Sequence, residues 1–165
     1  MFRIRKSILL FLTVIFSCFS LFVLPIHSIE LDESTRSVTL DSSGTIKTLT
    51  PEQVKRGKRL FNNTCAQCHN GGITKTNPNI GLEPESLSLA TPARDNVNSL
   101  VDYMKSPTSY DGEMSIVELH PSIKSAEIFS KMRNLTDEDL IAIAGHILIQ
   151  PKLGFEKWGG GKIYY

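Results

Sequence analysis

Apolar residues recur at three- and four-residue spacing in three segments of the chain, which is the pattern of an amphipathic helix. The first begins at Thr50, which is followed by a proline at the first helical position and by Gln53 at the third, so a capping box is predicted. Gly57 lies inside this helix at a cost of about 1 kcal/mol relative to alanine. We expect another helix to approach closely at Gly57; a tolerated surface glycine is the alternative.

The other two helices are predicted nearer the carboxyl end. One runs from about Asp95 to Lys105 and stops before Pro107. The last begins after Thr136, has three acidic residues in its first turn, and ends at Pro151. A short helical turn is also expected over 125–131. The apolar face of the last helix is predicted to comprise Leu140, Ile143, Ala144, Ile147 and Leu148.

Two segments outside the helices have their own patterns. Residues 37–40 and 45–49 flank the turn sequence 41–44, which predicts a small β-hairpin. A two-stranded hairpin is only marginally stable alone, so we expect it to lie on the helical core or on a partner. The segment 70–94 has little periodicity and several glycines and prolines, so it is predicted to be a long functional loop.

The first 28 residues are set apart by their composition. Three basic residues precede an apolar run from Ile8 to Leu24, and Ser28 offers a small residue for cleavage, as in a secretory signal peptide. Cleavage there would leave one domain, residues 29–165. The alternatives are an uncleaved membrane anchor, because 17 apolar residues approach the length of a bilayer span, and a lipid anchor on Cys18, which the bulky Phe16 disfavours.

Removal of this segment would leave 15 basic and 17 acidic residues, a net charge of −2, which argues against a nucleic-acid partner. It would also remove one of the three cysteines. The remaining pair, Cys65 and Cys68, is too close in sequence to join distant segments, so a disulfide framework is excluded.

The two cysteines belong to Cys65-Ala66-Gln67-Cys68-His69, the C-x-x-C-H sequence of a c-type haem attachment site. Thiols three positions apart lie on one side of a helical turn, where both can form thioethers with vinyl groups on one porphyrin edge. His69 then presents its imidazole to the iron. A zinc site lacks a suitably spaced histidine pair, and a thioredoxin-like redox pair lacks its βαβ context. One covalently attached haem c is therefore predicted, with the loop 70–94 around its edge.

The iron ligand opposite His69 is left open by spacing alone. His146 would lie off the apolar face of the last helix, so we expect it on the flank with a solvent or local hydrogen bond. Met104 belongs to an apolar helix face and is expected in the core. His120 lies in a connection, where the following proline holds the backbone extended, and is the favoured ligand. Met132, Met114 and an open site remain alternatives.

In small mono-haem cytochromes c, the first and last helices cross beside the haem-attachment motif, which is the arrangement predicted here. The predicted fold class is therefore all-α, with a hairpin at 29–49, a haem-binding core at 50–150 and a tail at 151–165. Aromatic residues at both ends of the glycine-rich stretch 158–165 favour docking of this tail into another protein. The alternative is a tail folded over its own domain.

The motifs resemble the PsbV family, the extrinsic low-potential cytochromes c of photosystem II in cyanobacteria and red-algal plastids. The resemblance covers nearly the whole chain after the signal peptide. Its most specific parts are residues 65–69, 71–78, 100–105, 110–112, 120–122, 131–136, 144–148 and 158–165.

This resemblance implies that His120 is the second axial ligand. It also implies a thylakoid-lumen protein, peripheral to the membrane, that binds the photosystem II core and other extrinsic subunits. There it would shield the manganese–calcium cluster and help to retain calcium and chloride. Two filled axial positions leave no site for oxygen or peroxide, which argues against an enzyme. A freely diffusing electron carrier is the second functional hypothesis, and a haem enzyme such as a peroxidase is the third.

Overall fold

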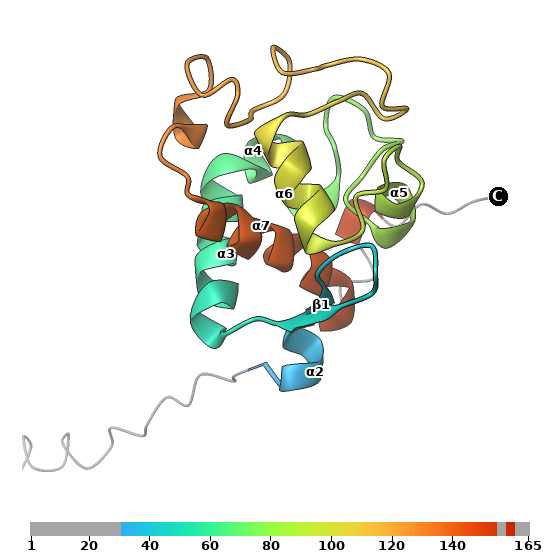
Figure 1. Cartoon of the computed structure of the whole chain (residues 1–165), viewed down its shortest axis with the longest axis vertical. Coiled ribbons are helices and arrows are strands. Elements are labelled where there is room, and N and C mark those ends of the chain that lie inside the picture. Colours follow the sequence, from blue (N-terminus) through green and yellow to red (C-terminus); the bar gives the residue numbers. More distant parts are fainter. Residues whose placement is uncertain (1–30, 155–157, 161–165) are drawn as a thin grey trace, which may run out of the picture. The chain divides into compact units, whose positions relative to one another are not determined.

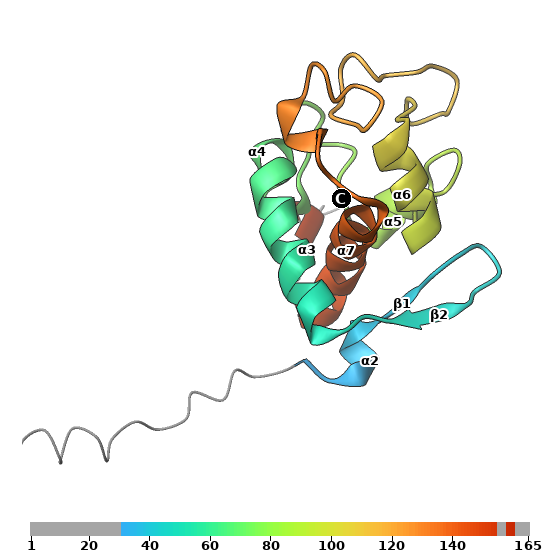
Figure 2. The same cartoon turned by 60° about the vertical axis from the view of Figure 1, so that its left-hand side comes forward.

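The computed structural model describes residues 31–154 and 158–160. Three helices build the core: α3 (Pro51–Thr64), α6 (Val97–Lys105) and α7 (Asp137–Ile149). Figures 1 and 2 show α7 between α3 and α6, and α7 contacts both helices. The predicted all-α class with crossing first and last long helices is confirmed.

The starts of α3 and α7 are set by local sequence. The Thr50 hydroxyl accepts a hydrogen bond from the Gln53 amide at 3.1 Å, and the Gln53 side chain accepts one from the Thr50 amide at 2.9 Å. Thr136 and Asp139 form the same reciprocal pair at α7. Each box satisfies two amide groups that a helix otherwise leaves without partners, which fixes the helix boundary.

Helices α3 and α7 come into backbone contact at Gly57. A Cβ atom there would overlap the Ala142 carbonyl oxygen and lie 2.8 Å from its carbon and 3.1 Å from His146 Cβ. An ion pair beside the crossing joins Arg56 Nε to Asp139 Oδ1 at 2.6 Å. The predicted close approach at Gly57 is therefore confirmed.

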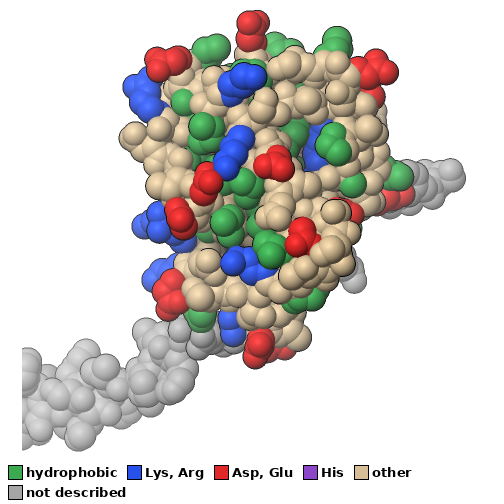
Figure 3. All heavy atoms as spheres, viewed as in Figure 1, with side chains coloured by type: hydrophobic (Ala, Val, Ile, Leu, Met, Phe, Trp, Pro, Cys, Tyr) green, Lys and Arg blue, Asp and Glu red, His purple; other side chains and the backbone are tan. Residues whose placement is uncertain are grey.

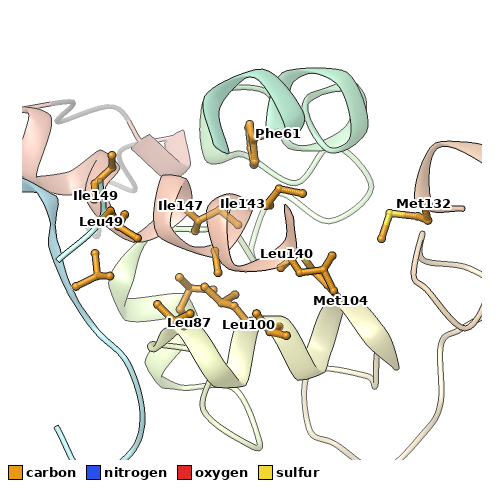
Figure 4. Packing of buried hydrophobic residues seen from close by; sticks show 14 residues of the cluster. Leu49, Phe61, Leu87, Leu100, Met104, Met132, Leu140, Ile143, Ile147 and Ile149 are labelled. Carbon is orange, nitrogen blue, oxygen red and sulfur yellow. The ribbon is translucent and has the colours of Figure 1, made fainter. Parts of the chain in front are cut away.

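Helix α7 is buried on more than one face, in contrast to the single apolar face predicted for it. Leu148 is only partly buried, whereas Ala142, His146 and Ile149 are buried. The reason is that α3, α6 and the strand β1 (Ser37–Thr39) all pack against α7. Figure 4 shows Phe61 of α3 and Leu100 of α6 near the α7 side chains that fill the core.

The predicted hairpin is present and lies on the helical core. Strand β1 pairs antiparallel with β2 (Ile46–Thr48), with Val38 opposite Lys47. Val38 is buried, and Leu49, just after β2, packs against Gly145 of α7. A short helix that the sequence pattern did not predict, α2 (Glu33–Arg36), precedes the hairpin.

Several short elements complete the described chain. The segment 70–94 is not a continuous loop as predicted, because Pro84 starts a short helix there and Leu87 is buried in the core. The turn expected over 125–131 is a 3₁₀ helix over Ser130–Met132. Helical elements of the described chain not yet bounded are α4 (Ala66–His69), η1 (Asn70–Gly72), α5 (Pro84–Ser88), η3 (Gln150–Leu153) and η4 (Trp158–Gly160).

Acidic and basic side chains are interspersed over the face shown in Figure 3, as a near-neutral composition predicts. Within residues 31–154 and 158–160, no helix combines the length and apolar character that crossing a bilayer requires. The apolar run 8–24 lies outside the described residues, as does the predicted cleavage site.

Candidate haem-binding site

One helical turn positions the C-x-x-C-H residues. Cys65 caps α3, and α4 follows directly, so the Cys65 carbonyl accepts hydrogen bonds from the amides of Cys68 at 3.1 Å and His69 at 2.9 Å. Neither cysteine takes part in a disulfide. Burial, with a smaller effect of Cys68, raises the pKa of Cys65 to about 12, so its thiol is neutral.

His120 lies near His69 although 50 residues separate them in sequence. The two ring centres are 6.0 Å apart, and the ring planes make an angle of 50°. When two imidazoles bind one first-row metal ion from opposite sides, with metal–nitrogen distances of about 2 Å, their ring centres lie roughly 6 Å apart. The spacing of this pair therefore fits a metal ion held between two histidines.

Hydrogen bonds at Nδ1 orient both rings. His69 Nδ1 lies 3.1 Å from the Thr74 hydroxyl, and His120 Nδ1 donates to the Pro121 carbonyl at 2.9 Å. An Nδ1 that donates to an oxygen leaves Nε2 as the metal-binding nitrogen. Pro121 thus contributes its carbonyl group to the orientation of the His120 ring.

Burial keeps both imidazoles in the neutral form that binds metal. Burial first, and then the neighbouring His120, lower the pKa of His69 to about 4. Burial also lowers the pKa of His120, and the positive charge of Arg94 acts in the same direction.

The remaining sulfur candidates occupy different surroundings. Met104 is buried in the core, as predicted, and Met132 belongs to the same core cluster. Met114 is exposed. The zinc alternative would need four ligands. Among residues 31–154 and 158–160, no three His, Cys, Asp or Glu side chains are grouped in a way that suits a metal ion.

The prediction for His146 is confirmed in its local hydrogen bond but wrong in its position, because the side chain is buried rather than on the flank. Its exposed fraction is 6%, and its ring centre lies 5.0 Å from that of Phe61 and 6.2 Å from that of Trp158. The predicted local hydrogen bond is present, because Gln150 Nε2 donates to His146 Nδ1 at 3.1 Å. The helical pattern failed here because a distant segment, η4, covers this side of α7.

Trp158 folds over its own domain, which is the alternative considered for the tail. Its Nε1 donates to the Leu82 carbonyl at 2.9 Å, and its ring centre lies 5.7 Å from that of Phe61. A Cβ on Gly72 would come within 2.8 Å of the indole, so a glycine is required beneath it. Residues 161–165, the rest of the predicted docking tail, lie outside the described residues.

Sequence reasoning missed two residues beside His120. The Tyr103 ring of α6 approaches the His120 ring edge-on, and Arg94 lies over the tyrosine ring. Tyr103 falls next to Met104 and thus off the apolar stripe of α6, so periodicity gave no sign of it. A buried arginine in a segment without periodicity gives no sequence signal either.

Comparison with known proteins agrees with this architecture. The solved structure of cytochrome c549 matches with a TM-score of 0.76 and 51% sequence identity, covering 78% of this chain and 99% of that one. The fold is therefore that of a small c-type cytochrome, a class that carries a c-type haem. The cytochrome c-550 domain model matches residues 29–165, and the chain belongs to that family.

Curated relatives named photosystem II extrinsic protein V cover most of the chain. The protein from Gracilaria tenuistipitata var. liui is 71% identical over 161 residues, which is 98% of each chain. That from Porphyra purpurea is 78% identical over 140 residues, covering 85% of this chain and 86% of its own. The resemblance to the PsbV family that the sequence motifs predicted is confirmed.

Proposed function

We propose that this chain is an extrinsic photosystem II subunit in the thylakoid lumen that carries one covalently attached haem. Cys65 and Cys68 form the two thioethers, and His69 and His120 are the axial ligands of the iron. The observation that carries this proposal is the 6.0 Å separation of the two half-buried imidazoles, whose Nδ1 atoms are already hydrogen-bonded.

The bound haem supplies one-electron chemistry. The residues of this chain hold the group on a single helical turn and present one imidazole to each side of it. His69 and His120 would fill both axial positions and so would exclude oxygen and peroxide from the iron. An iron closed in this way is unlike the open iron site of an enzyme such as a peroxidase. Electron transfer and structural support are the roles that such a site can perform.

The name of the relatives supports a place on photosystem II beside its core and other extrinsic subunits. There the protein would stabilise the manganese–calcium cluster and its calcium and chloride requirement, while remaining peripheral to the membrane. Residues 1–28 would serve as the export signal, and a domain beginning at Ile29 would fold in the lumen.

Salt washing of photosynthetic membranes tests this assignment. We expect the protein to stay bound to the membranes when they are washed at low salt and to be released at high salt. Oxygen evolution should fall as the protein is released. Adding back the purified holoprotein should restore oxygen evolution, whereas buffer alone should not. Recovery of the protein in the soluble fraction before any salt is added would instead support a freely diffusing carrier of the same fold.

The ligation is tested separately on the purified protein. Haem staining after denaturing electrophoresis should be positive, since thioethers survive denaturation. The optical spectrum should be that of low-spin iron, and carbon monoxide and cyanide should bind poorly at neutral pH. Ready binding of either would show an accessible iron and contradict ligation by two histidines.

A further inference from the structure

We propose that Arg94 and Tyr103 are positioning residues that act through His120, fixing the orientation of its ring and raising the reduction potential of the haem. This inference rests on the proposed function, in which His120 is an iron ligand. Neither residue would itself bind the iron.

Two contacts connect Arg94, Tyr103 and His120, and each of them involves the Tyr103 ring. The ring centres of Tyr103 and His120 are 5.1 Å apart with the planes at 64°, an edge-on arrangement that aromatic pairs favour. Arg94 Cζ lies 4.0 Å from the centre of the same tyrosine ring, within the range of a cation–π contact. Tyr103 thus contacts both the cation and the imidazole.

Arg94 is anchored firmly enough to hold this position. Its exposed fraction is 7%, and Nη2 donates hydrogen bonds to the carbonyls of Thr108 at 3.2 Å and Ser109 at 2.7 Å. These carbonyls lie in the chain that leads from α6 to His120. The guanidinium therefore ties down the same segment that presents the ligand.

In the part of the chain that the structure describes, no ion pair joins Arg94 to an acidic side chain. Among the described residues its contacts are to carbonyl oxygens and to the Tyr103 ring, and the ion pairs found there involve Arg56 and Lys105 instead. A guanidinium stays protonated under physiological conditions. Buried charges interact more strongly than exposed ones because water screens them less.

A cation near His120 has a predictable effect on the haem. The oxidised haem carries one more positive charge than the reduced haem, so a fixed positive charge nearby disfavours the oxidised form. The reduction potential is therefore higher with Arg94 than without it. Tyr103 and the Pro121 carbonyl act on orientation, because both contact the His120 ring and together restrict its rotation.

The charge is tested with R94M in the purified holoprotein, with R94K as the matched control that keeps the charge. We expect R94M to shift the equilibrium about tenfold toward the oxidised form, a fall of about 59 mV for one electron, and R94K to shift it much less. Equal potentials in R94M and the wild type would overturn this half of the proposal. If R94M does not fold, R94Q replaces it.

The orientation is tested with Y103L, with Y103F as the control that keeps the ring. The electron paramagnetic resonance spectrum of oxidised low-spin haem depends on the angle between the two axial imidazole planes. We expect Y103L to change or broaden this spectrum and Y103F to leave it unchanged. An unchanged spectrum in Y103L would overturn the positioning role. A wild-type spectrum without the low-spin signature of two imidazoles would instead reject the proposed ligation itself.

Discussion

At the scale of single residues, replacing His120 with methionine tests whether His120 is the second iron ligand. In H120M the haem should remain attached through Cys65 and Cys68, while its potential rises, because methionine opposite histidine favours reduced iron. Spectroelectrochemical titration measures the potential, and H146Q serves as a control histidine substitution away from the site. A potential and spectrum unchanged in H120M would show that another residue is the ligand.

His146 gives a prediction about pH. Burial, with a smaller effect of Lys58, lowers the pKa of His146 to about 4, from a usual value of about 6.5. Between these pH values the unfolded chain binds the proton and the folded chain does not, so stability falls as the pH falls from about 6.5 to about 4. The slope from one such group is at most about 1.4 kcal/mol per pH unit.

Comparing H146Q with the wild type isolates this contribution, because glutamine does not titrate. Chemical denaturation of both proteins at several pH values should show a shallower loss of stability in H146Q across this window. Parallel curves for the two proteins would mean that His146 titrates normally in the folded state. The comparison is preferable to the wild-type slope alone, since carboxylates such as Asp139 add their own pH dependence.

At the scale of elements, the crossing of α3 and α7 depends on Gly57. In an isolated helix, alanine in place of glycine stabilises by about 1 kcal/mol. Here the added Cβ would overlap the backbone carbonyl of Ala142, which moves only if α7 shifts. We expect G57A to lower the free energy of unfolding by roughly 1–3 kcal/mol, the usual cost of overpacking.

Denaturant titration measures this change, and K55A on the exposed side of the same helix is the control, with an expected effect within about 0.5 kcal/mol. A gain in stability for G57A would show that the helices are farther apart than the structure places them.

The elements also show which features can be predicted from sequence. The capping box at Thr50, the start of α7 after Thr136, the hairpin and the attachment turn depend on neighbours within a few residues, so local patterns predicted them. The burial of His146 depends on Trp158, twelve residues away, and the Arg94–Tyr103 contact depends on how a non-periodic segment folds back. Such contacts are set by tertiary packing, which periodicity does not encode.

The pairing of His69 with His120 could be predicted only in part from the sequence. Spacing favoured His120 and left methionines open, and only the family resemblance singled it out before the fold brought the two rings together. A ligand pair separated by a long connection has no local signal of its own.

At the scale of the whole molecule, the tail 161–165 provides a test of docking. Trp158 is anchored on the core by its hydrogen bond to Leu82, so a chain ending at Gly160 should keep its haem spectrum and stability. Tyrosines at the centre of an interface often contribute about 2 kcal/mol or more, which is roughly a thirtyfold change in affinity. We therefore expect the shortened protein to rebind salt-washed membranes at least that much more weakly.

The double variant Y164F/Y165F keeps both aromatic rings at the chain end and is the matched control, with rebinding close to that of the wild type. Titrating each holoprotein onto salt-washed membranes, and measuring bound haem and restored oxygen evolution, gives the affinities. If the chain ending at Gly160 rebinds as tightly as the wild type, the last five residues do not dock. The contact with photosystem II would then have to come from the folded domain, where the exposed side chains of Leu119 and Ile128 would be the next to substitute.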